Sequence, residues 1–288
     1  MIIAFIGLGM MGRPMAERLI AGGLDVRVSD ADPALAEAFG AHWRASAQAA
    51  VEGAHIVITM LPNGPIVRQV VEGLADSLAA GAIVIDCSSS DAGGTVELGK
   101  LLAAKGAALI DAPVSGGVPL AREGKLTLMV GGADDALFAT IEPVLACMGA
   151  RIVRVGVLGS GHAAKAINMA VAACTMAATC EGLALGEAFG IDPAVLLDVI
   201  NSSTGRSAVG ETVIKNHVLT GTYAQGFALA LMAKDVATAE LMRDQLGLNL
   251  PMLETTHCQW QAAKAAVAPG ADFSEFNRFV TSQIAGQS

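Results

Sequence analysis

The chain is predicted to be an α/β protein in which a doubly wound, mostly parallel sheet is followed by an all-helical C-terminal domain. From residue 1 to about residue 160, short β-branched or apolar runs alternate with helix-like stretches, which is the pattern of βαβ units covered on both faces. After Gly159-Ser160-Gly161 hardly any β-branched run remains, and apolar residues recur at helical spacing. A length of 288 residues is enough for about two domains, and we place them at residues 1–161 and 162–288.

Short apolar runs are the predicted strands of the sheet. In chain order they are Ile2–Ile6, Val26–Ser29, Ile56–Leu61, Ala82–Asp86, Ala108–Val114, Leu126–Val130 and Ile152–Val155. The stretch Met10–Ala21, which stops at Gly22-Gly23, predicts the first helix. The stretch His162–Gly190 is rich in alanine and lacks proline, so it predicts one long helix leaving the sheet domain, and Asp192-Pro193 begins the next helix.

Charge and composition limit the partners of the chain. The formal net charge is −9 and no block of lysines or arginines occurs, so a nucleic acid would be repelled. Charged residues make up 16% of the chain, whereas about 25% is usual. This shortage of charge indicates that another subunit covers part of the surface, and we expect an obligate homo-oligomer without a nucleic-acid partner.

The cysteines and the apolar segments indicate a soluble, cytoplasmic protein. The five cysteines are odd in number and lack metal-ligand spacing, which is typical of reduced thiols. The least charged stretch, Ala166–Cys180, ends at Glu181, short of the ~20 apolar residues that a membrane span requires. The start of the chain, Met1–Ile6, lacks the basic region of a secretory signal. We therefore expect no membrane partner.

A glycine-rich hexapeptide follows the first predicted strand and opens the first predicted helix. In that context the first glycine makes the turn, the second lets a pyrophosphate approach the backbone, and the third lets the helix pack on the strand. The pyrophosphate would lie at the helix N-terminus, where free N–H groups favour an anion. A tight turn without a ligand is the alternative, and the strand-to-helix context disfavours it. The sequence thus predicts a Rossmann-type dinucleotide-binding domain, with cofactor-binding residues Gly7, Leu8, Gly9, Met10, Met11 and Gly12.

Asp30 ends the second predicted strand, 18 residues after Gly12. An acid at about this distance binds the hydroxyls of the adenosine ribose, and its charge repels a 2′-phosphate. The alternative is a solvated turn residue, since Asp32-Pro33 beside it is itself a turn signal. We predict that Asp30 binds the cofactor and that NAD is preferred over NADP.

Another glycine pair offers a site for a small carboxylate. Asp111 to Gly117 ends a predicted strand, and Gly116-Gly117 can present successive N–H groups to an anion while Ser115 adds a hydroxyl. A glycine-rich connection without a ligand is the alternative.

Lys165 lies one turn into the predicted long helix, after Gly159-Ser160-Gly161. The helix dipole and partial burial both disfavour a cation there, which would let the amine exchange protons at neutral pH. Asn168, three residues later, shares its helix face and could bind Lys165 or the substrate. A solvated lysine and a structural asparagine are the alternatives.

In this combination of motifs, the chain resembles the β-hydroxyacid dehydrogenase family, which includes 3-hydroxyisobutyrate dehydrogenases and small semialdehyde reductases. The resemblance runs from Ile6 to about Phe279. The motifs that carry it are Gly7–Gly12 with Met15-Ala16, Met60-Leu61-Pro62, Asp111–Gly117 continuing to Gly124, Met129–Gly132, Gly159–Asn168 and Leu231–Asp235.

The resemblance implies a role for each matching residue. Lys165 would transfer the proton, and Ser115, Gly116 and Gly117 would hold the substrate carboxylate. Phe227 and Asp235 would border the pocket. Further contacts to the cofactor would come from Leu61, Pro62, Asn63, Ser89 and Lys234. The resemblance also implies a helical domain used for dimer or tetramer assembly.

One departure from the family pattern bears on the substrate. Relatives commonly carry a substrate-binding asparagine four residues after the lysine, and here that position is Met169. Asn168 cannot take its place, because neighbouring positions on an α-helix are ~100° apart. Met169 therefore predicts a more apolar or differently shaped substrate tail.

The predicted function is hydride transfer between NAD and a small 3-hydroxy acid or its semialdehyde, as in 3-hydroxyisobutyrate dehydrogenase. Alternatives on the same scaffold are a reductase of tartronate, succinate or sulfolactate semialdehyde-type substrates, an imine reductase, and a catalytically silent NAD-binding module. The presence of Lys165 disfavours a catalytically silent module. It also disfavours an imine reductase, because the resemblance suggests that such enzymes usually replace this lysine. A 6-phosphogluconate-type reaction is disfavoured by the short chain and its few arginines. Hydrolysis has no candidate machinery, because neither GxSxG nor HExxH occurs.

Overall fold

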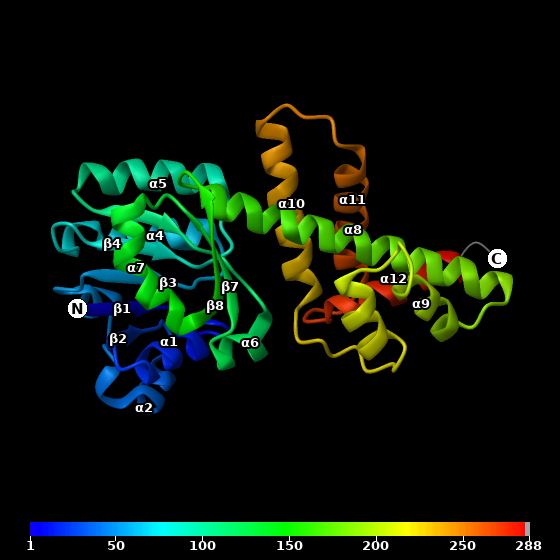
Figure 1. Ribbon diagram of the computed structural model, residues 1–288, viewed down its shortest axis with the longest axis horizontal. Coiled ribbons are helices and arrows are strands. Elements are labelled where there is room, and N and C mark those ends of the chain that lie inside the picture. The colour runs from blue at the N-terminus through cyan, green and yellow to red at the C-terminus, as the bar shows by residue number, and fades with distance from the viewer. Residues whose placement is uncertain (286–288) are drawn as a thin grey trace. The chain divides into compact units, whose positions relative to one another are not determined.

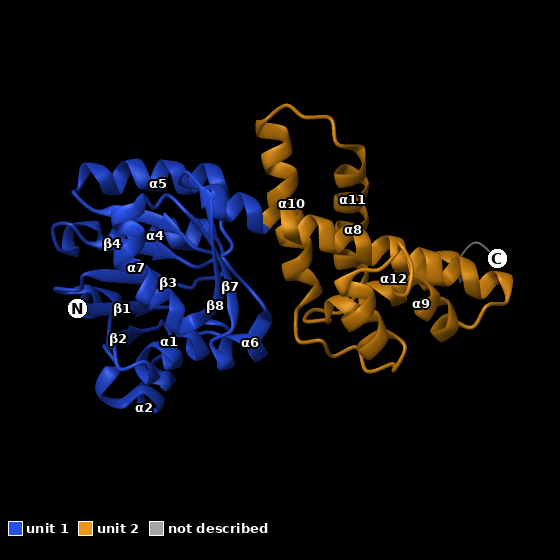
Figure 2. Ribbon diagram, in the orientation of Figure 1, with its two compact units in different colours: residues 1–165 blue, residues 166–288 orange. Residues whose placement is uncertain are grey.

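The computed structural model describes residues 1–285. It divides into two compact units, Met1–Lys165 and Ala166–Ser288 (Figure 2). The first unit contains the sheet, and the second is built from helices. The helix α8 (Ser160–Phe189) begins in the first unit and continues into the second.

The first unit is an α/β fold around one eight-stranded sheet (Figure 1). Its strands are β1 (Ile2–Ile6), β2 (Asp25–Ser29), β3 (Ile56–Thr59), β4 (Ile83–Asp86), β5 (Ala108–Asp111), β6 (Val114–Ser115), β7 (Leu126–Gly131) and β8 (Gly149–Gly156). The order is β2-β1-β3-β4-β5-β7-β6, and β8 pairs with β7. Strands β1 to β5 are parallel, whereas β7 runs antiparallel to β5 and β6. The predicted doubly wound, mostly parallel sheet is confirmed.

The expected strand over 108–114 is interrupted, and the interruption has a physical reason. Strand β5 ends at Asp111, and the chain resumes pairing only at Val114. Pro113 lies between them, and a proline has no N–H group to donate to a strand ladder. The break redirects the chain from a parallel into an antiparallel pairing.

Several helices of this unit begin after a residue whose side chain caps them. The helices of the unit are α1 (Gly12–Ala21), α2 (Ala36–Phe39), α3 (Ala47–Val51), α4 (Gly64–Leu74), α5 (Ala92–Ala104), α6 (Gly117–Glu123) and α7 (Asp135–Met148). Asn63, Asp91 and Asp134 precede α4, α5 and α7, and each side chain accepts a hydrogen bond from the third residue of its helix. The expected start of α1 at Met10 falls two residues early.

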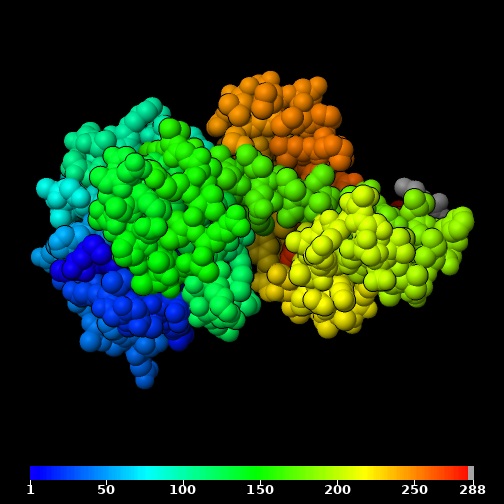
Figure 3. Space-filling model, in the orientation of Figure 1, coloured from blue at the N-terminus to red at the C-terminus, as the bar shows by residue number. Residues whose placement is uncertain are grey.

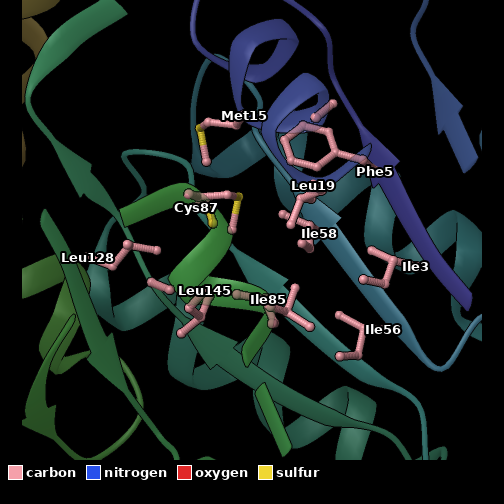
Figure 4. Close-up of a cluster of buried hydrophobic side chains, with 14 of the residues drawn as sticks. Ile3, Phe5, Met15, Leu19, Ile56, Ile58, Ile85, Cys87, Leu128 and Leu145 are labelled. Atoms are coloured by element: carbon pink, nitrogen blue, oxygen red, sulfur yellow. The ribbon is translucent and has the colours of Figure 1, made fainter. Parts of the chain in front are cut away.

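Each face of the sheet has its own core, because alternate residues of a strand point to opposite faces. Ile3 and Phe5 of β1 pack under α1 and α7 with Met15, Leu19 and Leu145 (Figure 4). The intervening residues of the strands lie in a second cluster with buried side chains of α3, α4 and α5. The green atoms of α7 and β8 form part of the surface that Figure 3 presents to the viewer. This two-sided burial explains why the strands are nearly uninterrupted apolar runs.

The described residues of the second unit form helices, with one isolated bridge between Ala228 and Asp272. After α8 the elements are α9 (Pro193–Asn201), the π-helix η4 (Val209–Val218), α10 (Leu229–Gln245), α11 (Pro251–Ala266) and α12 (Phe276–Ala285). Trp260 is completely buried, stacks on Phe276 at 4.2 Å between ring centroids, and donates its indole N–H to the Ala173 carbonyl. The predicted all-helical C-terminal region is confirmed.

Helix α8 is long and apolar enough to cross a membrane, by length and composition alone. The sequence-based expectation rested only on the least charged stretch of this helix, Ala166–Cys180. Within the second unit, however, Ala173, Met176 and Cys180 of α8 are fully buried in the hydrophobic core. One such helix is weak evidence for a membrane span, because the core helix of a soluble protein passes the same test.

Candidate active site

The carboxyl ends of the parallel strands bring polar residues into one row. Thr59, Asp86 and Asp111 end β3, β4 and β5, and they are direct neighbours in the sheet register. All three are buried. The chain order reverses between β1 and β3, and ligands of open α/β sheets bind outside the carboxyl ends of the strands at such a point.

The glycine-rich loop after β1 has the geometry of a pyrophosphate cradle. Gly7 has φ +98°, and a Cβ there would collide with the Met60 carbonyl. A Cβ at Gly12 would collide with the Gly7 carbonyl, so only glycine lets α1 approach the strand this closely. A Cβ at Gly9, in contrast, would meet nothing within 4 Å. No side chain of the described residues caps the N-terminus of α1. An uncapped helix behind an open glycine fits an anion.

Asp30 closes the loop from the second strand. Its Oδ2 accepts a hydrogen bond from Leu8 N at 2.6 Å, and its Oδ1 accepts one from Asp32 N at 2.8 Å. The half-buried carboxylate is therefore fixed beside the glycine loop. Each carboxylate oxygen has a second lone pair, so both can still accept from ribose hydroxyls.

The loops after β3 and β4 are joined to each other. Leu61 N donates to Ser88 Oγ at 2.9 Å. Asn63 uses its amide oxygen to cap α4, so its amide nitrogen is the group that it could offer a ligand. Pro62 is exposed, and Ser89 is half-buried between the buried Ser88 and Ser90. The cofactor roles of Leu61, Pro62, Asn63 and Ser89 stay predictions.

The second glycine motif also begins an uncapped helix. Gly116 and Gly117 are exposed and have φ of +133° and +67°, a region that favours glycine. Helix α6 starts at Gly117 without a side-chain cap from the described residues. Ser115 is half-buried next to this pair. The arrangement suits a small anion, although its carboxylate-binding role stays a prediction.

Asp111 anchors the beginning of α8. Its Oδ1 accepts from Gly159 N and its Oδ2 from His162 N, both at 2.8 Å. A Cβ at Gly161 would collide with the Met129 carbonyl, so this glycine allows the helix to reach the strand ends. Lys165 lies three residues after His162 and is half-buried. The amine predicted to transfer protons therefore stands on a helix start that is pinned to the sheet.

His162 and Asp86 form a buried cluster whose contacts the sequence did not predict. Asp86 Oδ1 accepts from Thr59 Oγ1 at 2.9 Å and from Ser88 N at 3.0 Å, and its Oδ2 accepts from Ser90 Oγ at 2.8 Å. His162 Nε2 lies 3.5 Å from Asp86 Oδ2. A signal was present in the sequence, because the predicted apolar strands end in polar residues. Polar residues of a solvated turn would not need to be buried.

The remaining candidates lie in the second unit. On α8, Asn168 is exposed and Met169 is buried in the hydrophobic core, as expected for neighbouring helix positions. Phe227 packs edge-on against Phe273. Lys234 Nζ lies 3.1 Å from Asp235 Oδ1, and Asp235 is only 5% exposed. Lys234 and Asp235 are therefore not the solvated face that adjacent opposite charges usually form.

Most of the chain matches two protein-family models. A family model described as the NAD binding domain of 6-phosphogluconate dehydrogenase matches residues 2–157. A second model, described as NAD-binding of NADP-dependent 3-hydroxyisobutyrate dehydrogenase, matches residues 159–280. The 3-hydroxyisobutyrate dehydrogenase of Pseudomonas aeruginosa is 38% identical over 291 residues, which cover 96% of this chain and 97% of the relative.

The chain belongs to the β-hydroxyacid dehydrogenase family. Another relative, the 2-(hydroxymethyl)glutarate dehydrogenase of Eubacterium barkeri, is 38% identical over 87% of this chain and 85% of its own. The solved structure of Mycobacterium tuberculosis 3-hydroxyisobutyrate dehydrogenase with L-serine has a TM-score of 0.90 and 33% identity, and covers 97% of this chain and 98% of that chain. The protein is therefore an NAD(P)-dependent oxidoreductase, as the sequence predicted.

Proposed function

We propose that this dehydrogenase oxidises a small 3-hydroxy acid, or reduces the matching semialdehyde, with NAD as its cofactor. The observation that carries the proposal is the anchored start of α8, which holds Lys165 at the edge of the sheet where the glycine loops lie. Relatives named 3-hydroxyisobutyrate dehydrogenase and 2-(hydroxymethyl)glutarate dehydrogenase support the same substrate class.

The residues of the first unit have separate tasks in this reaction. NAD, when bound, would supply the hydride acceptor or donor for the carbinol carbon of the acid. In oxidation the neutral Lys165 amine takes the hydroxyl proton, and in reduction its ammonium gives one back. Ser115, Gly116 and Gly117 hold the carboxylate of the acid, which fixes the carbinol carbon relative to Lys165. Asn168, Met169, Phe227 and Asp235 would shape the rest of the substrate site.

The carboxylate of Asp30 supports NAD rather than NADP. A 2′-phosphate would bring a second anion close to Asp30, whose carboxylate accepts hydrogen bonds from Leu8 N and Asp32 N. The ribose hydroxyls of NAD, in contrast, can donate to it. Lys234 and the loop residues Leu61, Pro62, Asn63 and Ser89 would complete the cofactor site.

We further propose that residues 1–161 bind the cofactor, that residues 162–288 serve substrate binding and assembly into a homodimer or homotetramer, and that the protein works in the cytoplasm. The assembly is supported by large apolar side chains on the surface of the second unit, among them Leu185 at 74% and Phe189 at 84% exposure. Leaving such side chains in water is unfavourable, and a second copy would cover them.

A substrate panel tests the proposed function. NAD-linked formation of NADH should be measured with 3-hydroxyisobutyrate, serine, glycerate, 4-hydroxybutyrate and sulfonated analogues. Reduction should be measured with the matching semialdehydes and with a cyclic imine. We expect the highest kcat/KM with a 3-hydroxy acid or its semialdehyde. Turnover of the imine alone would replace the proposal with imine reduction, and NAD binding without turnover of any compound would reduce the protein to a binding module.

A further inference from the structure

The start of α8 is linked to the loops after β3 and β4 through one buried histidine. His162 is 1% exposed, and its ring lies between two buried carboxylates, Asp86 and Asp111. Its Nδ1 lies 2.8 Å from Thr95 Oγ1, and its Nε2 lies 3.5 Å from Asp86 Oδ2. Each of these polar partners is buried as well. Burying so many polar groups is costly unless they are mutually satisfied.

The hydrogen positions in this cluster follow from the single hydroxyl hydrogen of Thr95. This hydroxyl can donate either to His162 Nδ1 or to the Asp91 carbonyl, which lies 2.9 Å away. If it donates to Nδ1, the ring hydrogen is on Nε2. If it donates to Asp91, Nδ1 must carry a hydrogen, and a bare Nε2 would then direct its lone pair at the Asp86 carboxylate. The first arrangement avoids this repulsion, and it places an N–H at Nε2, directed at Asp86.

The contact between His162 Nε2 and Asp86 is incomplete in this structure. A distance of 3.5 Å exceeds an ordinary hydrogen bond, and Nε2 has no hydrogen-bond partner among the described residues. Asp86 ends β4 and accepts hydrogen bonds from Ser88 N and Ser90 Oγ, so its carboxylate links the ring to the loop that follows this strand. That loop carries Ser89, and it holds Leu61 through Ser88. A shift of this loop is therefore transmitted to the start of α8.

We propose that His162 is a positioning residue of the reaction. Its Nε2–H is directed at Asp86, and the buried ring so fixes the loops after β3 and β4 relative to the helix turn that carries Lys165. The proposal rests on the proposed function for its kinetic part only. A misplacement of about 1 Å by a residue remote from the chemistry can cost on the order of 100-fold in rate. The role is thus large enough to measure, although the ring touches neither substrate nor cofactor in the proposal.

Paired substitutions of His162 test which ring nitrogen matters. Gln keeps a donor near the Nε2 position, Asn keeps one only near Nδ1, and Leu keeps neither. We expect His162→Leu and His162→Asn to lower kcat by about 10- to 100-fold, with KM for the acid and Kd for NAD within about threefold of wild type. His162→Gln should recover most of the loss. His42→Leu is the control, because this histidine bonds Val26 O near the amino end of β2, away from the strand ends of the site.

Two measurements that need no turnover decide the positioning itself. In ¹⁵N NMR of the whole, unsubstituted enzyme, the His162 Nε2 should carry a hydrogen. In amide hydrogen exchange, Gly159 and His162 should exchange faster in His162→Leu than in His162→Gln.

Several results would overturn the proposal. These are a hydrogen on Nδ1 with a bare Nε2, a kcat of His162→Leu within about threefold of wild type, or equal recovery by Asn and Gln. If wild type turns over no acid at all, the proposed function fails, but the NMR and exchange measurements still decide the role of His162. If His162→Leu does not fold, the Gln and Asn pair and the NMR measurement still decide it.

Discussion

Replacing Gly9 by alanine should separate cofactor binding from stability. Gly9 has no positive φ, and an added Cβ would meet nothing within 4 Å. Because alanine has fewer unfolded conformations than glycine, Gly9→Ala should leave stability unchanged or raise it by about 0.4–1 kcal/mol. The open space, however, is where the pyrophosphate would lie. A methyl group inserted into such a contact costs about 1–3 kcal/mol, so the Kd for NAD should rise by about 5- to 150-fold.

Two matched glycines make this prediction specific. Gly12→Ala places its Cβ 2.9 Å from the Gly7 carbonyl carbon and 3.3 Å from a Phe5 ring carbon, so it should lose both stability and NAD affinity. Gly73 lies on the exposed side of α4, and a Cβ added there would meet nothing within 4 Å. Gly73→Ala should therefore raise the free energy of unfolding by up to about 1 kcal/mol without any change in NAD affinity. Urea unfolding without ligand and calorimetric titration with NAD give the two quantities. If Gly9→Ala bound NAD as tightly as wild type, the loop would not be the pyrophosphate site.

Other predictions test the cofactor, the substrate and the buried thiols. Exchange of Asp30 for Arg should move the NAD/NADP ratio of kcat/KM toward NADP, and an unchanged ratio would refute the role of Asp30. Met169→Asn should shift the substrate profile toward more polar acids, with Met169→Leu as control, and an identical profile would dispose of the hypothesis. Burial, and then the charge of Asp86, raises the pKa of the Cys87 thiol, and burial raises the pKa of Cys180 to about 12. Just above about pH 9 these two thiols ionise in the unfolded protein but not in the folded one. The free energy of unfolding, which keeps its full value below that pH, should therefore fall by up to about 1.4 kcal/mol per pH unit and per thiol as pH rises. Urea unfolding of Cys180→Ala should show about half of this slope, and an unchanged slope would contradict the assignment.

The local parts of the fold follow from the sequence because their determinants are local. Strand β1 is found at Ile2–Ile6 as expected, and α8 begins within two residues of its predicted start. Asp192 caps α9, as its place before Pro193 predicted. A proline, a cap or an apolar run acts on its own neighbours, so its effect can be read without knowing the tertiary structure.

The buried cluster could not be predicted in the same way. Thr95 and His162 are 67 residues apart in sequence, and Thr59 and Asp86 are 27 apart. Neither pair has a spacing that local rules recognise. Thr59 and Asp86 meet because parallel strands bring their ends to one edge, whereas Thr95 and His162 lie on α5 and α8 and meet only through the tertiary structure. The strand pattern predicts this edge, but not which side chains there turn inward.

The most direct test of the account is the turnover of Lys165→Ala, measured as NADH formation with the best acid of the panel and compared with Lys100→Ala on the exposed face of α5. A positioned acid–base group contributes about 10²–10⁴-fold, so kcat should fall by that factor in Lys165→Ala while the Kd for NAD is unchanged. Lys100→Ala should match wild type in both quantities. Near-wild-type turnover by Lys165→Ala would contradict the account, because the proton would then be transferred by another group.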